Sequence, residues 1–398
     1  MHNGISSDID SLIASTIPEL QKLRHYLHQH PELSGQEYKT ALHICNFLKQ
    51  FYPTEILSNL GNGTGVVAIW DSGRPGPVVL FRAELDALPI HEDASSSFPY
   101  YSTAPGISHK CGHDGHAAMV AGMAALLHQQ PPAKGKVGLL FQPAEETGKG
   151  AAALIADERF TNIKPDFIFG LHNLPAFPLG EVVLKEGSFC AASRGMRITL
   201  EGKTSHAAEP EKAVTPTACV VSLLQQLPEA PALLEPTGLA LLTLTHARIG
   251  EPTFGITPGT ALVQATLRTF AEDDMIKLVN TCEKIATQEA RRHHLDVTIH
   301  YEDVFPATAN HKQAFQIIQK AAEHVSLQIQ YRNEPFRWSE DFGHYAAVAK
   351  IGFFGLGAGE EAFNLHHPEF NFPDSLLPYG LRIYKAILDV CMETTNVS

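Results

Sequence analysis

Two different patterns of apolar and polar residues divide the chain. From the N-terminus to about residue 185, apolar runs of strand length alternate with segments of helical periodicity, which is typical of a parallel sheet covered by helices. Helices are predicted over residues 37–51 and about 115–129. The predicted strands are residues 65–70, 77–81, 137–141, 167–171 and, far downstream, 352–356. We therefore expect an α/β domain with a mostly parallel sheet.

The order of elements changes between about residues 191 and 305. Strands are predicted over 196–202, 239–250, 261–270 and 296–303, and helices over 215–227 and 273–292. This β-α-β-β-α-β order is that of a ferredoxin-like α+β domain. Because the strand at 352–356 would complete the first sheet, the second domain is predicted to be an insertion. One domain would comprise residues 1–190 and 306–398, and the inserted domain residues 191–305.

Composition and charge narrow the class of protein. The 398 residues exceed the ~100 to 200 of a usual single domain, and 44% hydrophobic with 18% charged residues is an ordinary globular composition. The formal net charge of -13, with no run of Lys or Arg, argues against nucleic acid or an anionic membrane as partner. The first twelve residues do not resemble a signal peptide and no apolar run is long enough to span a membrane. We expect a cytoplasmic protein.

The six cysteines show no spacing pattern, which argues against a disulfide framework in a chain of this length. Cys45 and Cys282 lie on apolar stripes at helical spacing, so both are predicted to be core residues. Cys111 differs, because its neighbours in "SHKCGHDGHAAM" are polar residues and glycines.

Polar side chains follow the predicted strands of the first domain. They are Glu84 and Asp86, then Glu145 and Glu146, then His172, and finally His366 and His367. In open α/β sheets, ligands bind beyond the carboxyl ends of the strands. We therefore predict that these groups converge at one edge of the sheet.

Two local pairs suggest what chemistry gathers there. Cys111 and His113, separated by one glycine, could direct a thiolate and an imidazole at one ion. The adjacent Glu145 and Glu146 would repel each other unless a cation neutralises them or one is protonated. One carboxylate could then bind metal while the other acts as a general base in hydrolysis. The alternatives are that each histidine, one of 21, is an ordinary hydrogen-bonded residue, and that the glutamates begin an exposed helix.

The sequence resembles the metal-dependent amidohydrolases that include hippurate hydrolases, auxin-conjugate hydrolases and N-acetyl-diaminopimelate deacetylases. The resemblance covers almost the whole chain, and "CGHDGH" together with "PAEE" is specific for this branch of the wider aminopeptidase and aminoacylase family. The blocks that carry it, in order, are "LRHYLHQHPELSGQE", "FRAELDALP", "HKCGHDGH", "LLFQPAEETGKGA", "GLHN", "GKTSHAAEP", "SEDF" and "LHHPEF".

The resemblance implies a pair of divalent ions in the first, catalytic domain. Glu145 matches the general base of the family, and Asp86 matches a carboxylate that orients a ligand imidazole. His109 and His116 belong to the motif but are not ligands, and we expect no role for His367. The residues that match the metal ligands are Cys111, His113, Glu146, His172 and His366. Five ligands exceed the three of a usual single catalytic zinc site, and the donors leave zinc, manganese, nickel and cobalt open.

The resemblance also implies that residues 191–305 form a lid and dimerisation domain. His206 matches a histidine that reaches the substrate or the oxyanion of the transition state, although a surface turn is its ordinary setting. Arg268 matches a position suited to a carboxylate contact, with a salt bridge on the lid surface as the alternative. The chain departs from many relatives at two lid positions, where Gly255 replaces an asparagine and Thr215 replaces an acidic residue.

The implied reaction is hydrolysis of the amide of an N-acyl amino acid or a related small conjugate, which yields a carboxylic acid and an amino acid. A homodimer through the inserted domain is expected by the same resemblance. Three alternatives remain open at this point. They are a dipeptidase or carboxypeptidase with the same site, a non-catalytic relative that binds metal or ligand, and a redox role for Cys111.

Overall fold

The computed structural model describes residues 3–93 and 99–394 and divides into two compact units. Unit 1 comprises Met1–Phe189, Ala309–Glu334 and Asp341–Ser398, and unit 2 comprises Cys190–Thr308 and Pro335–Glu340. The inserted domain was predicted over residues 191–305, without the short segment Pro335–Glu340. Met1 and His2, part of the segment considered above as a signal peptide, lie outside the described residues.

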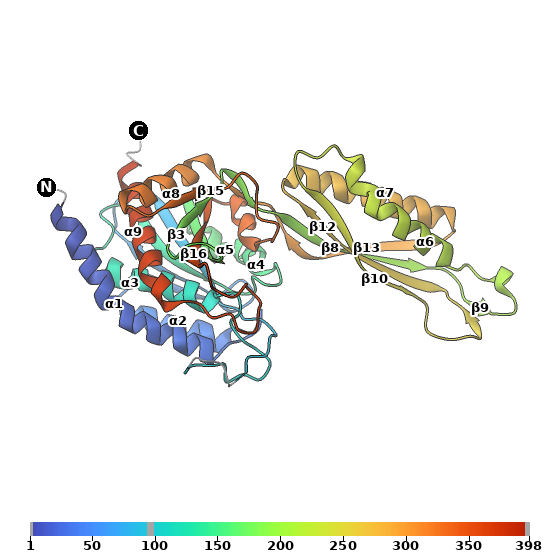
Figure 1. Cartoon of the computed structure of the whole chain (residues 1–398), viewed down its shortest axis with the longest axis horizontal. Helices are drawn as coiled ribbons and strands as arrows, with labels where there is room; N and C mark the ends of the chain where they lie inside the picture. The colour runs from blue at the N-terminus through green and yellow to red at the C-terminus, as the bar shows by residue number, and fades with distance from the viewer. Residues whose placement is uncertain (1–2, 94–98, 395–398) are drawn as a thin grey trace. The chain divides into compact units, whose positions relative to one another are not determined.

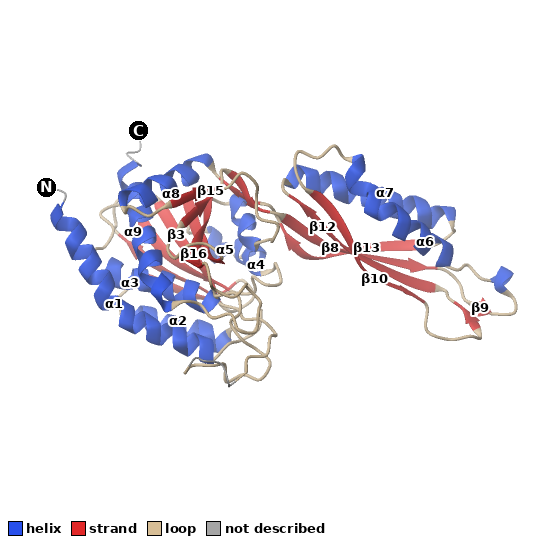
Figure 2. Cartoon of the chain, in the orientation of Figure 1, coloured by secondary structure: helices blue, strands red, loops and turns tan. Residues whose placement is uncertain are grey.

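A sheet forms the centre of unit 1 (Figures 1 and 2). It has eight strands, in the order β1-β2-β4-β3-β5-β16-β6-β15. Its strands are β1 (Glu55–Leu60), β2 (Gly65–Asp71), β3 (Val78–Glu84), β4 (Lys136–Gln142), β5 (Phe167–Pro175), β6 (Val182–Leu184), β15 (Ile329–Tyr331) and β16 (Lys350–Gly359). The four central strands β4, β3, β5 and β16 are parallel neighbours. On either side of these four strands the pairing becomes antiparallel, between β1 and β2, between β2 and β4, and between β16 and β6. The predicted α/β class with a mostly parallel sheet is confirmed.

Helices cover both faces of this sheet. The helices of unit 1 are α1 (Asn3–Gln29), α2 (Tyr38–Lys49), α3 (His113–Gln129), α4 (Gly150–Ala156), α5 (Glu158–Thr161), α8 (Lys312–His324), α9 (Leu377–Thr394) and the 3-10 helices η3 (Asp341–Ala347) and η4 (Asp374–Leu376). Helices α1, α2, α3, α8 and α9 share one core cluster with alternate strand residues such as Phe81 and Phe169. On the other face, Phe342 of η3 packs on Phe353 with ring centroids 4.9 Å apart. Burial on both faces explains why these strands are continuous apolar runs.

Helix α3 is buried around its circumference from His113 to Leu127. A helix surrounded by protein needs no polar stripe, and its mostly small, apolar residues satisfy that condition. Its first turn therefore lies inside unit 1. This placement brings residues of the segment 108–116 to the carboxyl ends of β3 and β5, where His116 contacts Glu84 and Cys111 contacts His172.

Unit 2 has the predicted β-α-β-β-α-β order. Its main elements are β8 (Ala192–Glu201), α6 (Thr217–Gln226), β10 (Ala240–Ile249), β12 (Thr260–Thr269), α7 (Glu272–Arg292) and β13 (Asp296–Phe305). The four strands form an antiparallel sheet in the order β10-β12-β8-β13, which is a ferredoxin-like arrangement. Side chains of β12 alternate between buried and partly exposed, and the buried ones share a core with α6 and α7.

Short elements complete the chain. They are β7 (Gly187–Cys190), β9 (Ser205–His206), η1 (Pro210–Lys212), η2 (Leu227–Leu233), β11 (Ile256–Thr257) and β14 (Thr308–Asn310). Cys45 and Cys282 are buried in the cores of units 1 and 2, as predicted, and all six cysteines are free thiols. Within residues 3–93 and 99–394, no helix combines the length and the apolar character that crossing a membrane requires.

Candidate metal centre

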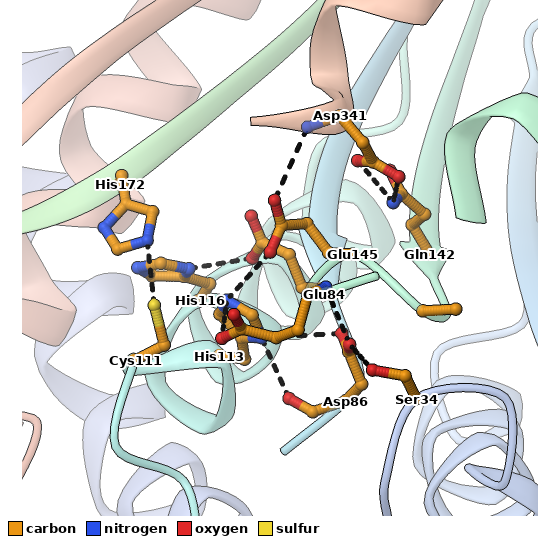
Figure 3. Close-up of polar contacts among 12 residues, drawn as sticks. Ser34, Glu84, Asp86, Cys111, His113, His116, Gln142, Glu145, His172 and Asp341 are labelled. Carbon is orange, nitrogen blue, oxygen red and sulfur yellow. Dashed lines mark hydrogen bonds and ion pairs between the residues drawn. The ribbon is translucent and has the colours of Figure 1, made fainter. Parts of the chain in front are cut away.

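Three of the predicted ligands meet where α3 begins and β5 ends. Cys111 and His113 flank Gly112, which has φ +95° and whose added Cβ would lie 2.3 Å from Oδ1 of Asn173. Only glycine therefore suits this turn. His172 lies within β5, and its Nε2 is 3.3 Å from Sγ of Cys111 (Figure 3). One ligand atom from each of the three residues lies within 4.8 Å of the others.

Glu146 connects this group to a fourth segment. Its Oε1 is 3.8 Å from Nε2 of His113 and 3.8 Å from Nε2 of His366. His366 lies in a loop near the C-terminus, and its side chain is 52% exposed. Cys111, Glu146 and His366 form a second group with donor atoms within 4.8 Å. The predicted convergence of all five candidate ligands is therefore present in unit 1.

Two buried atoms indicate that these residues fit a cation. Nδ1 of His113 donates to the main-chain carbonyl of Asp86 at 2.8 Å, so Nε2 is the nitrogen that carries the lone pair whenever the ring is neutral. This Nε2 and Oε1 of Glu146 are both buried without a hydrogen-bond partner. A lone pair and a carboxylate oxygen that face each other across 3.8 Å would be stabilised by a positive ion between them. Thiolate, imidazole and carboxylate donors together suit zinc-like divalent ions.

The ionisation of the donors supports the same interpretation. Burial raises the pKa of Glu146 to about 7. Burial also raises the pKa of the Cys111 thiol, and the nearby Glu146 adds to the effect. Burial and the neighbouring His116 lower the pKa of His172, which keeps its imidazole neutral. Without a cation Glu146, Cys111 and His172 favour their uncharged forms, whereas, in spite of its burial, Cys111 and Asp86 raise the pKa of His113. A divalent ion would supply the positive charge that allows thiolate and carboxylate to form, with His113 neutral.

Glu145 lies in the turn between β4 and α4, and it is buried. The alternative of an exposed helix start for Glu145 and Glu146 is therefore wrong. Oε2 of Glu145 is 3.9 Å from Nε2 of His113, and Oε1 accepts the backbone N–H of Asp341 at 3.4 Å (Figure 3). The preceding Ala144 has φ +50°, and its N–H donates to Glu37 at 2.8 Å.

Asp86 contacts the proposed ligand His113 through both its backbone and its carboxylate. Its main-chain carbonyl accepts from His113, whereas its carboxylate Oδ1 lies 3.5 Å from that Nδ1. Oδ2 accepts from Oγ of Ser34 at 2.7 Å and from the backbone N–H of Glu146 at 3.0 Å. The carboxylate therefore holds the Glu146 turn, and the backbone of the same residue orients His113.

His116 has ordinary partners for both ring nitrogens. Nδ1 donates to Glu84 at 2.8 Å, and Nε2 accepts the backbone N–H of Asn173 at 3.0 Å. Glu84 also forms an ion pair with Arg82. These contacts give Glu84 and His116 protein partners that do not require a metal ion, and we do not include His116 among the proposed ligands.

The two candidates from the inserted domain lie in unit 2. His206 is exposed on β9 opposite Ile256 of β11, and its Nδ1 accepts the N–H of Ala208 at 3.1 Å. Nη1 of Arg268 donates to the carbonyl of Arg337 and to Oγ of Ser339, both at 2.9 Å. The roles of His206 and Arg268 toward substrate stay predictions.

Ser34, Glu37 and Asp341 support the site, but we had not predicted any role for them. Each lies in a block that carries the family resemblance, and that resemblance was the only signal in the sequence that could have pointed to them.

The two positions at which the lid departs from many relatives have local contacts. The carbonyl of Gly255 accepts the N–H of Ala207 at 3.0 Å beside His206, and the hydroxyls of Thr215 and Thr217 form a hydrogen bond.

Residues 80–390 match the family described as Peptidase family M20/M25/M40. The N-acetyl-L-cysteine deacetylase of Bacillus subtilis (strain 168) is 33% identical over 367 residues, which cover 90% of this chain and 85% of that protein. The hippurate hydrolase of Campylobacter jejuni is 30% identical, over 92% of this chain and 94% of its own. The crystal structure of the YXEP protein of Bacillus subtilis, described as a dinuclear metal binding peptidase from the M20 family, has a TM-score of 0.81 and 28% identity. It covers 96% of this chain and 99% of its own.

Proposed function

The chain belongs to peptidase family M20/M25/M40, and on this basis we propose that it is a dinuclear-metal-dependent amidohydrolase of N-acyl amino acids or related amide conjugates. The observation that carries the proposal is the convergence of five metal-type donors beside Glu145, with Cys111, His113 and His172 buried and His366 at the exposed side. The names of two relatives, an N-acetyl-L-cysteine deacetylase and a hippurate hydrolase, support an amide between an acyl group and an amino acid as the bond that is cleaved.

The proposed ligands are Cys111, His113, Glu146, His172 and His366. When bound, two divalent ions would polarise the amide carbonyl and lower the pKa of the attacking water. Glu146 lies within 3.8 Å of both His113 and His366, so its carboxylate would help to hold the ions beside both imidazoles. Zinc, manganese, nickel and cobalt are all compatible with these donors.

Glu145 is proposed as the general base and then the general acid. It lies beside the donor cluster, and the N–H of Asp341 holds one of its oxygens. Glu145 accepts a proton from the attacking water and returns it to the leaving nitrogen. The turn that carries it is restrained by Glu37 through Ala144, which limits how far the carboxylate can move during the transfer.

Unit 2 is proposed to supply contacts with substrate. His206 would donate to the oxyanion that develops from the carbonyl oxygen, and Arg268 would bind the carboxylate of the amino acid part of the substrate.

We further propose that the chain forms a homodimer through unit 2. Leu241 and Ile249 on the sheet-edge strand β10 are 39% and 36% exposed, which is a suitable apolar surface for a second copy. Sedimentation of the full chain would test this by its molar mass.

A second candidate function is a dipeptidase, because the YXEP protein is described as a peptidase. The same centre would hydrolyse a peptide bond if the pocket admitted a free amino terminus. We would incubate metal-stripped chain, re-supplied with Zn, Mn, Co or Ni, with N-acetyl, N-benzoyl and indoleacetyl amino acids and with dipeptides. Release of amino acid from the acylated set, absent in Glu145→Gln, is the expected result. Cleavage of dipeptides alone would instead establish the peptidase.

A further inference from the structure

A chain of buried charges runs beside the metal centre in unit 1 and has no part in the proposed reaction. We refer to it as the charge chain, and its members in order of contact are Lys110, Glu92, His28, Asp114, Arg24 and Asp374. Lys110, His28, Asp114 and Arg24 are at most 1% exposed, and Glu92 is 7% exposed. Charges at this depth require partners.

Each member contacts a group of the opposite sign. Lys110 forms an ion pair with Glu92, whose two oxygens lie 3.1 and 3.2 Å from Nε2 of His28. Nδ1 of His28 lies 2.8 Å from Oδ2 of Asp114. Because both ring nitrogens face carboxylates, both donate and the ring is an imidazolium. Arg24 then lies 3.5 Å from Asp114 and 2.8 Å from Asp374.

The charge chain holds both ends of the turn that carries two proposed ligands. Lys110 directly precedes Cys111, and Asp114 directly follows His113. The partners come from α1, from the segment after β3 and from η4, so the turn is tied to three distant parts of unit 1.

Lys110 also connects this turn to the loop of His366. Its main-chain carbonyl accepts the N–H of His366 at 2.7 Å, and its ammonium donates to the carbonyl of Phe370 at 2.9 Å. His366 has φ +65°, a conformation that a residue other than glycine adopts only when its surroundings impose it. One lysine therefore restrains two segments that must approach each other for their ligands to share an ion.

Stability alone does not explain these charges. Removing several ions from water costs several kcal/mol each, and well-packed apolar residues of similar volume often stabilise a protein as well or better. A bonded network also fixes the distances and directions between the charged groups that it joins. The position of the network around the ligand turn indicates where those distances matter.

We propose that the charge chain positions the metal centre, with Lys110 as the residue that sets the Cys111 and His113 turn against His366. Loss of the Lys110 ammonium should weaken metal binding more than it weakens the fold. This inference rests on the metal ligands of the proposed function, but its test needs no substrate.

The test is a metal titration of the stripped full chain with Mn²⁺ and with Zn²⁺ in a competing chelator, together with thermal melting of the metal-free protein. We expect Lys110→Met, which keeps the aliphatic stem, to bind at least one ion about 10- to 100-fold more weakly. Lys110→Arg, which keeps the charge, should recover part of the affinity. The matched control is Lys385→Met on α9, whose lysine is 13% exposed and paired with Asp389; its metal affinity should equal that of the wild type.

Glu92→Gln tests the same link without the loss of a lysine, and it decides the question if Lys110→Met does not fold. Wild-type metal affinity in a folded Lys110→Met, or in Glu92→Gln, would overturn the inference, and a lowered melting temperature alone would assign the charge chain to stability. If the wild type itself bound no metal, the proposed function would fail together with this inference. If the wild type bound metal and the variants bound it equally well, this inference would fail and the proposed function would stand.

Discussion

The two units place their proposed functional residues in opposite surroundings. In unit 1, Cys111 and His113 are 7% and 1% exposed and lie within a dense set of hydrogen bonds from distant segments. In unit 2, His206 is exposed on the two-residue strand β9, and its contacts are with the neighbouring Ala208 and with β11 of the same unit. Unit 1 fixes the distances between its candidate metal ligands, whereas unit 2 presents the His206 side chain at its surface.

The sheets explain this difference. Strand β5 is buried at eight consecutive positions from Phe167 to Leu174, because helices cover both faces of the sheet. Strand β12 alternates between buried and partly exposed residues, because its core contacts with α6 and α7 occupy one face. Apart from His366, the groups proposed to hold a charged ion are therefore largely shielded from water, and electrostatic interactions are stronger in such surroundings.

Removing the metal should have the largest effect on activity, and its effect on hydrogen exchange should differ between the two units. A chelator is expected to abolish hydrolysis, and zinc or manganese should restore it. An ion at 100 times its dissociation constant stabilises the form that binds it by about 2.7 kcal/mol. Hydrogen exchange should therefore increase in residues 108–116 and 144–150 and stay unchanged in β8, β12 and β13. Equal changes in both units would contradict the assignment of the metal centre to unit 1 alone.

Glu145→Gln is expected to lower kcat by about 10²- to 10⁴-fold, because the amide cannot accept the proton from water. The substitution keeps the shape of the side chain, so metal affinity should remain near that of the wild type. Steady-state kinetics and a metal titration of the same sample would measure both. A variant that lost its metal as well would show that Glu145 is a ligand rather than the base.

His206→Ala should lower kcat by about 10²- to 10³-fold, the usual effect of removing one oxyanion donor. Metal affinity and melting temperature should not change, because this exposed side chain packs against little of unit 2. The measurement is kcat and KM beside a thermal melt, with His206→Gln as a variant that keeps a donor. Unchanged kcat in His206→Ala would limit unit 2 to a structural role.

Arg268→Met should have the smallest effect, a rise in KM of about tenfold, equivalent to ~1.4 kcal/mol. Its hydrogen bonds to Arg337 and Ser339 provide a competing structural explanation. The comparison is between an N-acyl amino acid and its carboxamide. A rise in KM for the carboxylate alone supports substrate binding, and an equal change for both substrates would indicate that Arg268 only stabilises unit 2.

The sequence predicted the elements that carry their own periodicity. The central strands of unit 1 and the whole β-α-β-β-α-β order of unit 2 follow from apolar patterns of local origin. The spacing of Cys111 and His113, with Gly112 between them, suggested a pair of donors for one ion, and the recurrence of carboxylates and imidazoles at the strand ends strengthened that prediction. Motif resemblance then added the remaining proposed ligands, and the structure places all of them together.

What the sequence could not indicate is the set of polar partners around the site. His28 on α1 has the local context of an ordinary helical residue, and only the fold shows that it is buried between Glu92 and Asp114. Glu37 and Asp341 likewise gain their contacts with the Glu145 turn from elements far away along the chain. Local periodicity records which face of an element is apolar, and it contains no information on which distant side chain meets a polar one. The sequence by itself therefore determined the elements, the family and the candidate donors, and the tertiary structure decided which charges are buried together, because burial and pairing are properties of the packed chain.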